Sequence, residues 1–340
     1  YEKHLYGDAG LFHLPESPKL YVLATNLSEG SACAFHRGGM LLQRRSGDGR
    51  RRMEEINIGL ATVSMAVAAS SAFPGFFPPL ELRASEVGAR EGEFGRQALT
   101  DGGIYDNIGL RMLRHIEQML VLGKSPDGEQ SAIEGHLDGI FVSNAGASFK
   151  VQTGGRAGGL LSTAMRSSDI LMDRVNQMEL ESFEGTSGVL FFPITDVVSE
   201  SSDEYAPHPE VQRQAALIRT DMDRFSDLEV SALVQHGYCV TRDVFRRKSP
   251  EMVLDCPQHP PWNPIAGKNG REIVSLSNEK YALQAARQLQ KSSSRKIFST
   301  LLSLRDWTTY VWVPLLATIL LTMPYMLYNA HVTSVHRGYV

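Results

Sequence analysis

Short apolar runs recur along the chain, and longer segments with helical patterning separate them. The short runs cover residues 19–26 (KLYVLATN), 136–144 and 188–194. Runs this short and this apolar predict strands buried on both faces, as in a parallel sheet between helices. The helical segments cover residues 57–69, 108–122, 160–184, 209–225, 226–246 and 277–290. Strands that alternate with helices predict an α/β fold.

Local signals define two further segments. Ser226 and Glu229 have the S-x-x-E spacing of a capping box, which predicts the start of the helix that follows them. Residues 72–79 (AFPGFFPP) contain three prolines and a glycine, which exclude a regular helix. The three phenylalanines of this loop either line an apolar substrate site or belong to the core. They are Phe73, Phe76 and Phe77.

The longest uncharged segment lies near the C-terminus. Residues 310–328 (YVWVPLLATILLTMPYMLY) are enough to cross about 30 Å of hydrocarbon. Aromatic residues near both ends of the segment are typical of membrane interfaces. We expect a transmembrane helix over residues 307–329, and a buried core helix is the alternative. Three basic residues precede the segment and one follows it: Arg295, Lys296, Arg305 and Arg337. The positive-inside rule then predicts a membrane-anchored protein whose globular part faces the cytoplasm.

These patterns divide the chain into three parts. Residues 1–250 carry the predicted α/β domain. Residues 251–306 form a linker, rich in Pro, Asn and Gly over 256–270, followed by an amphipathic helix. Residues 307–329 are the predicted membrane segment. The chain starts at Tyr1 with a sequence typical of a domain interior, so we expect further sequence upstream.

Composition narrows the function classes. The chain has 340 residues and a formal net charge of -4, whereas a nucleic-acid-binding domain is typically strongly basic. The three cysteines, Cys33, Cys239 and Cys256, form neither a C-x-x-C pair nor a cluster with zinc-like spacing. We therefore expect no nucleic acid partner and no zinc site built on cysteines. The cysteines are expected to be buried thiols in a reducing compartment.

The segment with the clearest chemistry is residues 100–107 (TDGGIYDN). Asp101 follows a predicted strand over residues 96–100, so its carboxylate would lie at the C-terminal end of that strand, where open α/β sheets bind ligands. Gly102 and Gly103 allow the backbone to turn sharply and to approach another group closely. Burial against apolar groups would raise the pKa of the aspartate and make it a better base. A tight turn with a capping aspartate is the alternative.

Three segments, in this order, resemble the patatin-like phospholipases, in particular their bacterial members. They are Leu23-Ala24-Thr25-Asn26, the Ala-rich segment that runs into the loop at residues 68–79, and Thr100-Asp101-Gly102-Gly103 with Asn107. The match is good over residues 20–113 and less specific over residues 138–246. The resemblance implies the C-terminal portion of a three-layer α/β/α catalytic domain whose N-terminal part is missing here.

The resemblance also implies the chemistry of the site. In this family a serine in a G-x-S-x-G elbow attacks an ester carbonyl, an aspartate in a DGG motif acts directly as the base, and a glycine-rich loop forms the oxyanion hole. Asp101 would be the base, within a DGG motif of Asp101, Gly102 and Gly103. Residues near the substrate would be Phe73, Phe76, Phe77 and Asn107.

The sequence departs from the family pattern at the nucleophile. It contains no G-x-S-x-G, and its glycine-rich stretch at residues 154–159 follows the aspartate instead of preceding a serine. We therefore expect the serine upstream of Tyr1. The chain by itself is expected to be inactive, because an aspartate without its nucleophile forms no acyl-enzyme.

The resemblance implies a lipid acyl hydrolase of the phospholipase A or esterase type, with no metal and no organic cofactor. Its substrates would be phospholipids or other lipid esters, and a membrane would be its partner. Two alternatives remain. One is a non-catalytic, membrane-tethered lipid-binding protein that keeps the same fold. The other is a transacylase with the same serine–aspartate dyad.

Basic residues gather around a predicted turn at residues 46–49, which follows a strand prediction over residues 31–43 that Gly38 and Gly39 interrupt. The basic residues are Arg44, Arg45, Arg50, Arg51 and Arg52. Such a cluster either faces anionic lipid head groups or forms the solvated tip of a hairpin.

Overall fold

The computed structural model describes residues 1–45, 47, 49, 51–74, 77–122, 139–146, 160–183, 188–219, 224–249, 259–262, 279–293 and 309–337. The chain forms two compact units. Unit 1 comprises Tyr1–Asn144 and Phe149–Phe192, and unit 2 comprises Ala145–Ser148 and Pro193–Val340. The glycine-rich stretch at residues 154–159 and most of the predicted linker at residues 256–270 lie outside the described residues.

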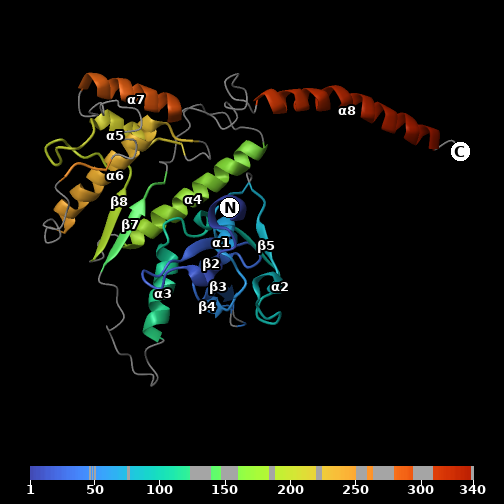
Figure 1. Cartoon of the computed structure of the whole chain (residues 1–340), viewed down its shortest axis with the longest axis horizontal. Coiled ribbons are helices and arrows are strands. Elements are labelled where there is room, and N and C mark those ends of the chain that lie inside the picture. The colour runs from blue at the N-terminus through green and yellow to red at the C-terminus, as the bar shows by residue number, and fades with distance from the viewer. Residues whose placement is uncertain are drawn as a thin grey trace. The chain divides into compact units, whose positions relative to one another are not determined.

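A six-stranded sheet forms the centre of unit 1 (Figure 1). Its strands are β1 (Val22–Asn26), β2 (Ser31–His36), β3 (Gly39–Arg45), β4 (Arg51–Ile56), β5 (Leu80–Leu82) and β6 (Gln97–Asp101), in the order β4-β3-β2-β1-β6-β5. Every neighbouring pair is antiparallel, so the predicted parallel sheet is wrong. Strand β1 is apolar because it lies inside the sheet, between β2 and β6, and not because its neighbours are parallel.

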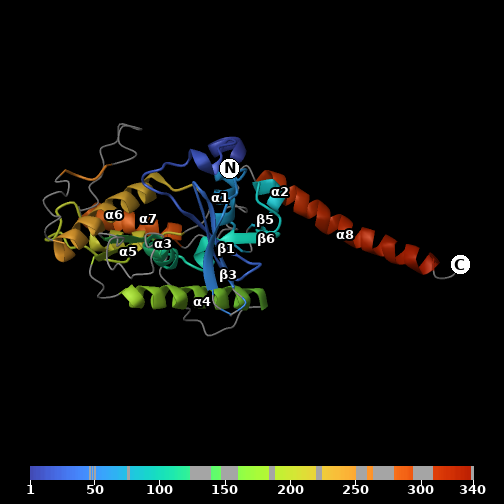
Figure 2. The same ribbon diagram turned by 90° about the horizontal axis from the view of Figure 1, so that it is seen from below.

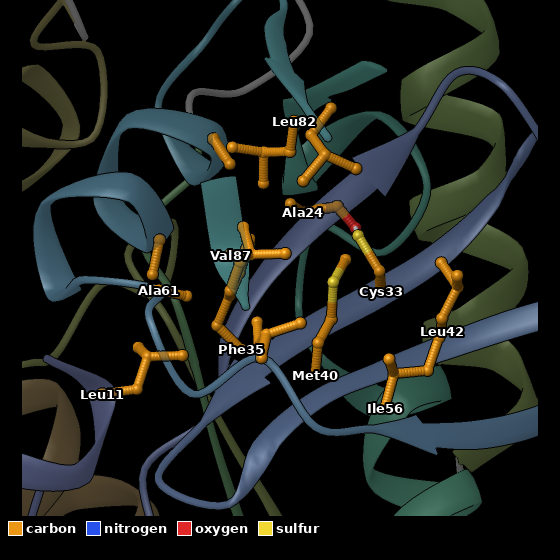
Figure 3. Close-up of a cluster of buried hydrophobic side chains, with 14 of the residues drawn as sticks. Leu11, Ala24, Cys33, Phe35, Met40, Leu42, Ile56, Ala61, Leu82 and Val87 are labelled. Carbon is orange, nitrogen blue, oxygen red and sulfur yellow. Dashed lines mark hydrogen bonds between the residues drawn. The ribbon is translucent and has the colours of Figure 1, made fainter. Parts of the chain in front are cut away.

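Side chains that alternate along β2 and β3 contribute to two separate apolar clusters. On one face, Cys33 and Phe35 of β2 and Met40 and Leu42 of β3 pack with α1 (Val63–Ser70) and α2 (Ala84–Val87), as Figure 3 shows. On the other face, Ala32, Ala34 and Leu41 pack with Met112 and Ile116 of α3 (Leu110–Leu122). The period of two in the strands thus places helices on both faces, and the fold is mixed α/β.

Capping explains where the first α-helix starts. Helix α1 begins at Val63, six residues later than predicted, and the Thr62 hydroxyl accepts a hydrogen bond from the backbone N–H of Met65 at 3.2 Å. A threonine at this position satisfies one of the free N–H groups of the first turn. Two short helical turns, η1 (Glu2–Tyr6) and η2 (Leu11–His13), precede β1.

The remainder of unit 1 is a long helix and a strand pair. Helix α4 spans Leu160–Phe183, and β7 (Ile140–Asn144) pairs with β8 (Val189–Pro193), close to the predicted bounds. An apolar cluster joins these elements to the start of α3. It contains Leu110, Val142, Phe183 and Val189.

Unit 2 contains four α-helices among its described residues. They are α5 (Pro209–Ala215), α6 (Asp227–Lys248), α7 (Glu279–Ser293) and α8 (Thr309–Arg337). Helices α5, α6 and α7 share an apolar cluster that includes Val211, Ala232, Ala286 and Leu289. The capping box is confirmed, because Ser226 and Glu229 exchange hydrogen bonds at the start of α6.

Helix α8 covers the segment predicted to cross a membrane. None of the helices in the described part of the chain combines the length and the apolar character that a bilayer span needs, so the predicted transmembrane helix over residues 307–329 is wrong. The segment lacks charge, but Pro314, Pro324, Thr318, Thr322 and three tyrosines dilute its aliphatic residues. Absence of charge was therefore too weak a criterion for a membrane span.

Candidate functional site

The candidate site is the turn that leaves β6. Asp101 is the last residue of β6 and opposes Ala24 of β1, and residues Gly102–Ile104 form a single helical turn, η3. The Asp101 backbone is held on two sides. Its N–H donates to the carbonyl of Ala72 at 3.2 Å, and its carbonyl accepts from the Thr25 hydroxyl at 2.8 Å. Thr25 of β1 and Ala72, which follows α1, therefore hold the backbone from which the Asp101 carboxylate projects.

Gly102 lies against the backbone of β1. A Cβ added at this position would lie 2.7 Å from the carbonyl oxygen of Leu23 and 2.9 Å from its carbonyl carbon. Backbone atoms inside a sheet cannot move aside without loss of pairing. The first glycine of the motif is therefore required for close approach of two backbones.

Gly103 lies against two polar side chains. Its N–H donates to Oδ1 of Asp101 at 2.8 Å. A Cβ added there would lie 2.8 Å from Oδ1 of Asn107 and 3.1 Å from Oδ1 of Asp101. The second glycine thus leaves room for the Asp101 carboxylate and the Asn107 amide on the same small surface. The structure brings these two predicted site residues together.

The electrostatics of Asp101 suit a base. Its side chain is half-buried, and burial raises the pKa of the carboxyl, while the hydrogen bond from the Gly103 N–H acts in the opposite direction. Oδ2 makes no hydrogen bond with any described residue. A carboxylate with a raised pKa and an oxygen that is free to accept can take a proton from a neighbouring hydroxyl.

The phenylalanine loop is anchored directly beside this carboxylate. The carbonyl of Ala72 accepts both the Asp101 N–H and the Thr100 hydroxyl, the latter at 2.6 Å. Phe73 follows Ala72 and is half-buried, and Phe77 is 42% exposed. Phe76 lies outside the described residues. The chain path therefore places the start of the loop at the candidate site, whereas a substrate-lining role for its side chains stays a prediction.

Asp106 is a second aspartate in this turn, and the sequence interpretation gave it no role. It is 4% exposed, and its Oδ2 accepts the N–H of Met112 in α3 at 2.8 Å. Burial raises the pKa of Asp106, against the effect of the backbone N–H groups of Met112, Arg111 and Gly109. The sequence did contain a signal for this role, because Asp106 lies shortly before the predicted helix and an aspartate at such a position often accepts hydrogen bonds from the first turn.

A further group of charged side chains supports the start of α3. Arg111 forms an ion pair with Glu179 of α4, whose side chain is buried. Burial raises the pKa of Glu179, and the nearby Asp106 carboxyl raises it further, whereas Arg111 lowers it. Arg114, one turn later, donates to the Ser182 carbonyl at 3.4 Å and lies 3.9 Å from the ring centre of Phe183. Helices α3 and α4 are thus joined beside the turn.

Tyr105 connects the turn to the hairpin of β3 and β4. Its hydroxyl donates to Oε1 of Gln43 at 3.1 Å and accepts from Nη1 of Arg51 at 2.7 Å. Nε2 of His115 lies 3.1 Å from Nε2 of Gln43. These contacts were not predicted, because they join residues more than 50 positions apart in the sequence.

The described residues offer no metal-binding group at the candidate site, and a cavity among them lies away from Asp101. The described residues contain no group of histidine, cysteine, aspartate and glutamate side chains that could hold a metal ion. A cavity of about 570 Å³ lies beside the turn between β2 and β3, with Tyr21, His36 and Glu55 in its wall. Neither Asp101 nor Asn107 lines this cavity.

One protein-family model matches the segment that contains the candidate site. A family model described as patatin-like phospholipase matches residues 47–114. Neither the curated proteins nor the solved structures include a match to the chain. The matched segment contains Asp101, both glycines, Asn107 and the start of α3. The part of the chain that builds this turn is therefore similar to a patatin-like phospholipase domain, which suggests a lipid acyl hydrolase.

Proposed function

We propose that the protein is a lipid acyl hydrolase with a serine–aspartate dyad, in which Asp101 is the base. The observation that carries the proposal is the position of the Asp101 carboxylate. It lies at the end of β6, between β1 and the edge strand β5, and keeps one oxygen without a partner among the described residues. It also lies against Gly103, where a side chain would displace it.

The nucleophile of this dyad is a serine encoded upstream of Tyr1. Its hydroxyl oxygen attacks the ester carbonyl carbon while its proton passes to Asp101, and the leaving alcohol takes that proton back. Water then attacks the acyl carbon while one of its protons passes to Asp101, and the fatty acid leaves as that proton returns to the serine oxygen. Because its pKa is raised, Asp101 is a better acceptor of the serine proton and of the water proton than an exposed aspartate would be.

The substrate class follows from the matched family and from the loop beside Asp101. Phospholipids and other lipid esters carry acyl chains that need apolar surroundings, and pockets for such ligands are lined mainly by apolar and aromatic side chains. Phe73 and the partly exposed Phe77 would supply such surface next to the carboxylate. No cofactor takes part in this chemistry.

The test is Asp101→Asn in a protein extended by the upstream coding sequence. We expect the turnover of a lipid ester to fall by about 10²–10⁴-fold, the usual contribution of a positioned general base. Asp8→Asn, at an exposed aspartate in the same unit, is the control and should leave turnover unchanged. Equal turnover in the Asp101→Asn variant and the parent protein would reject Asp101 as the base.

A lipid-binding protein without catalysis is the second candidate, because the sequence contains no G-x-S-x-G. A fluorophosphonate probe, which labels activated serines, separates the two. Labelling of the extended protein that disappears on mutation of an upstream serine supports the hydrolase. Lipid binding by an extended protein that never becomes labelled supports the second candidate.

A further inference from the structure

The hairpin of β3 and β4 places arginines opposite one another. Arg44 is paired with Arg52, and Arg45 with Arg51, at the end of the hairpin next to the turn between the two strands. Residues directly opposite in an antiparallel pair share a face, and like charges in such positions destabilise the pair. Because the two pairs are adjacent, each face of the hairpin carries one of them.

The rest of the molecule compensates these charges unequally. Arg44 is partly buried and pairs with Glu54 at 3.2 Å. The exposed Arg51 donates to the Tyr105 hydroxyl, which carries no charge, and Arg52 is also exposed. Arg45 makes neither an ion pair nor a hydrogen bond with any residue that the structure describes. The opposed Arg45 and Arg51 therefore have no carboxylate partner among the described residues, and an anion would offset their charge.

We propose that these four arginines, called here the basic hairpin, dock the protein on an anionic lipid surface. Phosphate groups that lie between the opposed guanidinium groups neutralise them, and arginine binds phosphate through paired hydrogen bonds. The occupant rests on the proposed function, since a lipid hydrolase must meet its substrate at a surface. Nucleic acid is a poorer fit, because the whole chain has a formal net charge of -4.

The basic hairpin is also connected to the candidate site. Arg51 donates to Tyr105, which lies four residues after Asp101 in the same turn, and Gln43 of β3 accepts from the same hydroxyl. A surface that holds Arg51 is therefore one hydrogen bond away from Tyr105, which follows the DGG motif.

Vesicle sedimentation of the full chain tests the proposal. The vesicles contain phosphatidylcholine alone, or phosphatidylcholine and phosphatidylserine in equal parts. Arg45→Gln/Arg52→Gln should lower the partition onto anionic vesicles by about 30-fold, since each arginine near such a surface contributes about a factor of five. Arg83→Gln/Arg96→Gln is the control, because it removes two exposed arginines next to β5, at the opposite edge of the sheet. It should lower the partition less than the hairpin variant does.

A second readout separates docking from a structural role. Arg45→Gln removes a like-charge pair, so its melting temperature should equal or exceed that of the parent while its vesicle binding falls. Equal loss of binding in the hairpin and control variants, or no loss in either, overturns the proposal. So does binding to a single-stranded RNA that is tighter than binding to the vesicles and equally sensitive to the hairpin change. Vesicle binding needs no serine, so this result is independent of the Asp101→Asn turnover.

Discussion

Asp101 and Asp106 lie five residues apart in one turn, yet their surroundings give them different work. Burial raises the pKa of both carboxyls. Asp101 is half-buried and accepts one N–H, from Gly103. Asp106 is 4% exposed and faces the N–H groups that open α3, with the Met112 N–H at 2.8 Å.

The difference shows that a raised pKa alone does not identify a base. Asp106 is enclosed: its Oδ2 accepts the Met112 N–H, and its buried Oδ1 has no hydrogen-bond partner among the described residues. A substrate therefore has no access to this carboxylate, and its movement would leave the Met112 N–H without its acceptor. Asp101 is only half-buried, so its free oxygen can accept a proton from a substrate or a nucleophile at little structural cost. We therefore interpret Asp106 as the anchor of the turn and Asp101 as its reactive group.

The largest stability effect that would sharpen this comparison is expected at Asp106. Asp106→Ala removes the acceptor at the start of α3 and should lower the free energy of unfolding of unit 1 by about 2–3 kcal/mol. Asp101→Asn should change it by less than about 0.5 kcal/mol, as is usual away from buried networks. Urea unfolding followed by far-ultraviolet circular dichroism measures both.

Tryptophan fluorescence is unsuited to this measurement. All three tryptophans, Trp262, Trp307 and Trp312, fall in the residue range of unit 2. Hydrogen exchange of peptides from β6 and α3 localises the change within unit 1. A stability loss at Asp101→Asn as large as that at Asp106→Ala would mean that both aspartates are structural.

The two glycines offer a second pair of matched changes. Gly102→Ala would drive a Cβ into the Leu23 backbone, and repacking of this kind costs about 1–3 kcal/mol. Gly103→Ala would meet only the ends of the Asn107 and Asp101 side chains, which can rotate, so its cost in stability should be less than about 1 kcal/mol. Thermal unfolding of both variants gives the order.

Gly103→Ala should lose more turnover than its small loss of stability would suggest. Gly103→Ala displaces the Asp101 carboxylate itself, so it should remove most of the activity of the extended, serine-containing protein while leaving it folded. Retained turnover in Gly103→Ala would show that the observed carboxylate position is not the reactive one.

Sequence patterns predicted the parts of the molecule that depend on near neighbours. The capping box at Ser226 and Glu229 fixed the start of α6, because its hydrogen bonds lie within one helical turn. Glu229 itself shows what such a pattern omits. Burial raises its pKa, but hydrogen bonds from Ser292, Ser226 and Arg219 outweigh burial and lower the pKa to about 2. Two of these partners lie outside the capping box and come together only in the folded chain.

Local patterns missed the direction of neighbouring strands and the contacts between residues distant in the sequence. The apolar run of β1 predicts a parallel strand, whereas its observed neighbours are antiparallel. Burial on both faces looks the same in a sequence whichever way the neighbouring strands run. The contacts of Asp106 and Tyr105 were missed for a related reason: hydrogen bonds to Met112 and Gln43 leave no periodic signal. By contrast, Asp101 and its glycines form a continuous motif, and this motif could be found without the fold.

The smallest expected effect is the dependence of stability on pH that Asp101 contributes. Because its folded pKa lies above its unfolded value of about 3.9, the stability that it supplies is complete below that pH. It is lost as the pH rises through the folded pKa. Wild type should therefore gain stability relative to Asp101→Asn as the pH falls from neutral to about 4. Urea unfolding of the two proteins at a series of pH values measures this difference, in which every other acid cancels.

A difference that does not change with pH would mean that Asp101 is as well solvated in the folded state as in the unfolded one. The carboxylate would then lack the burial that makes it a better base than an exposed aspartate.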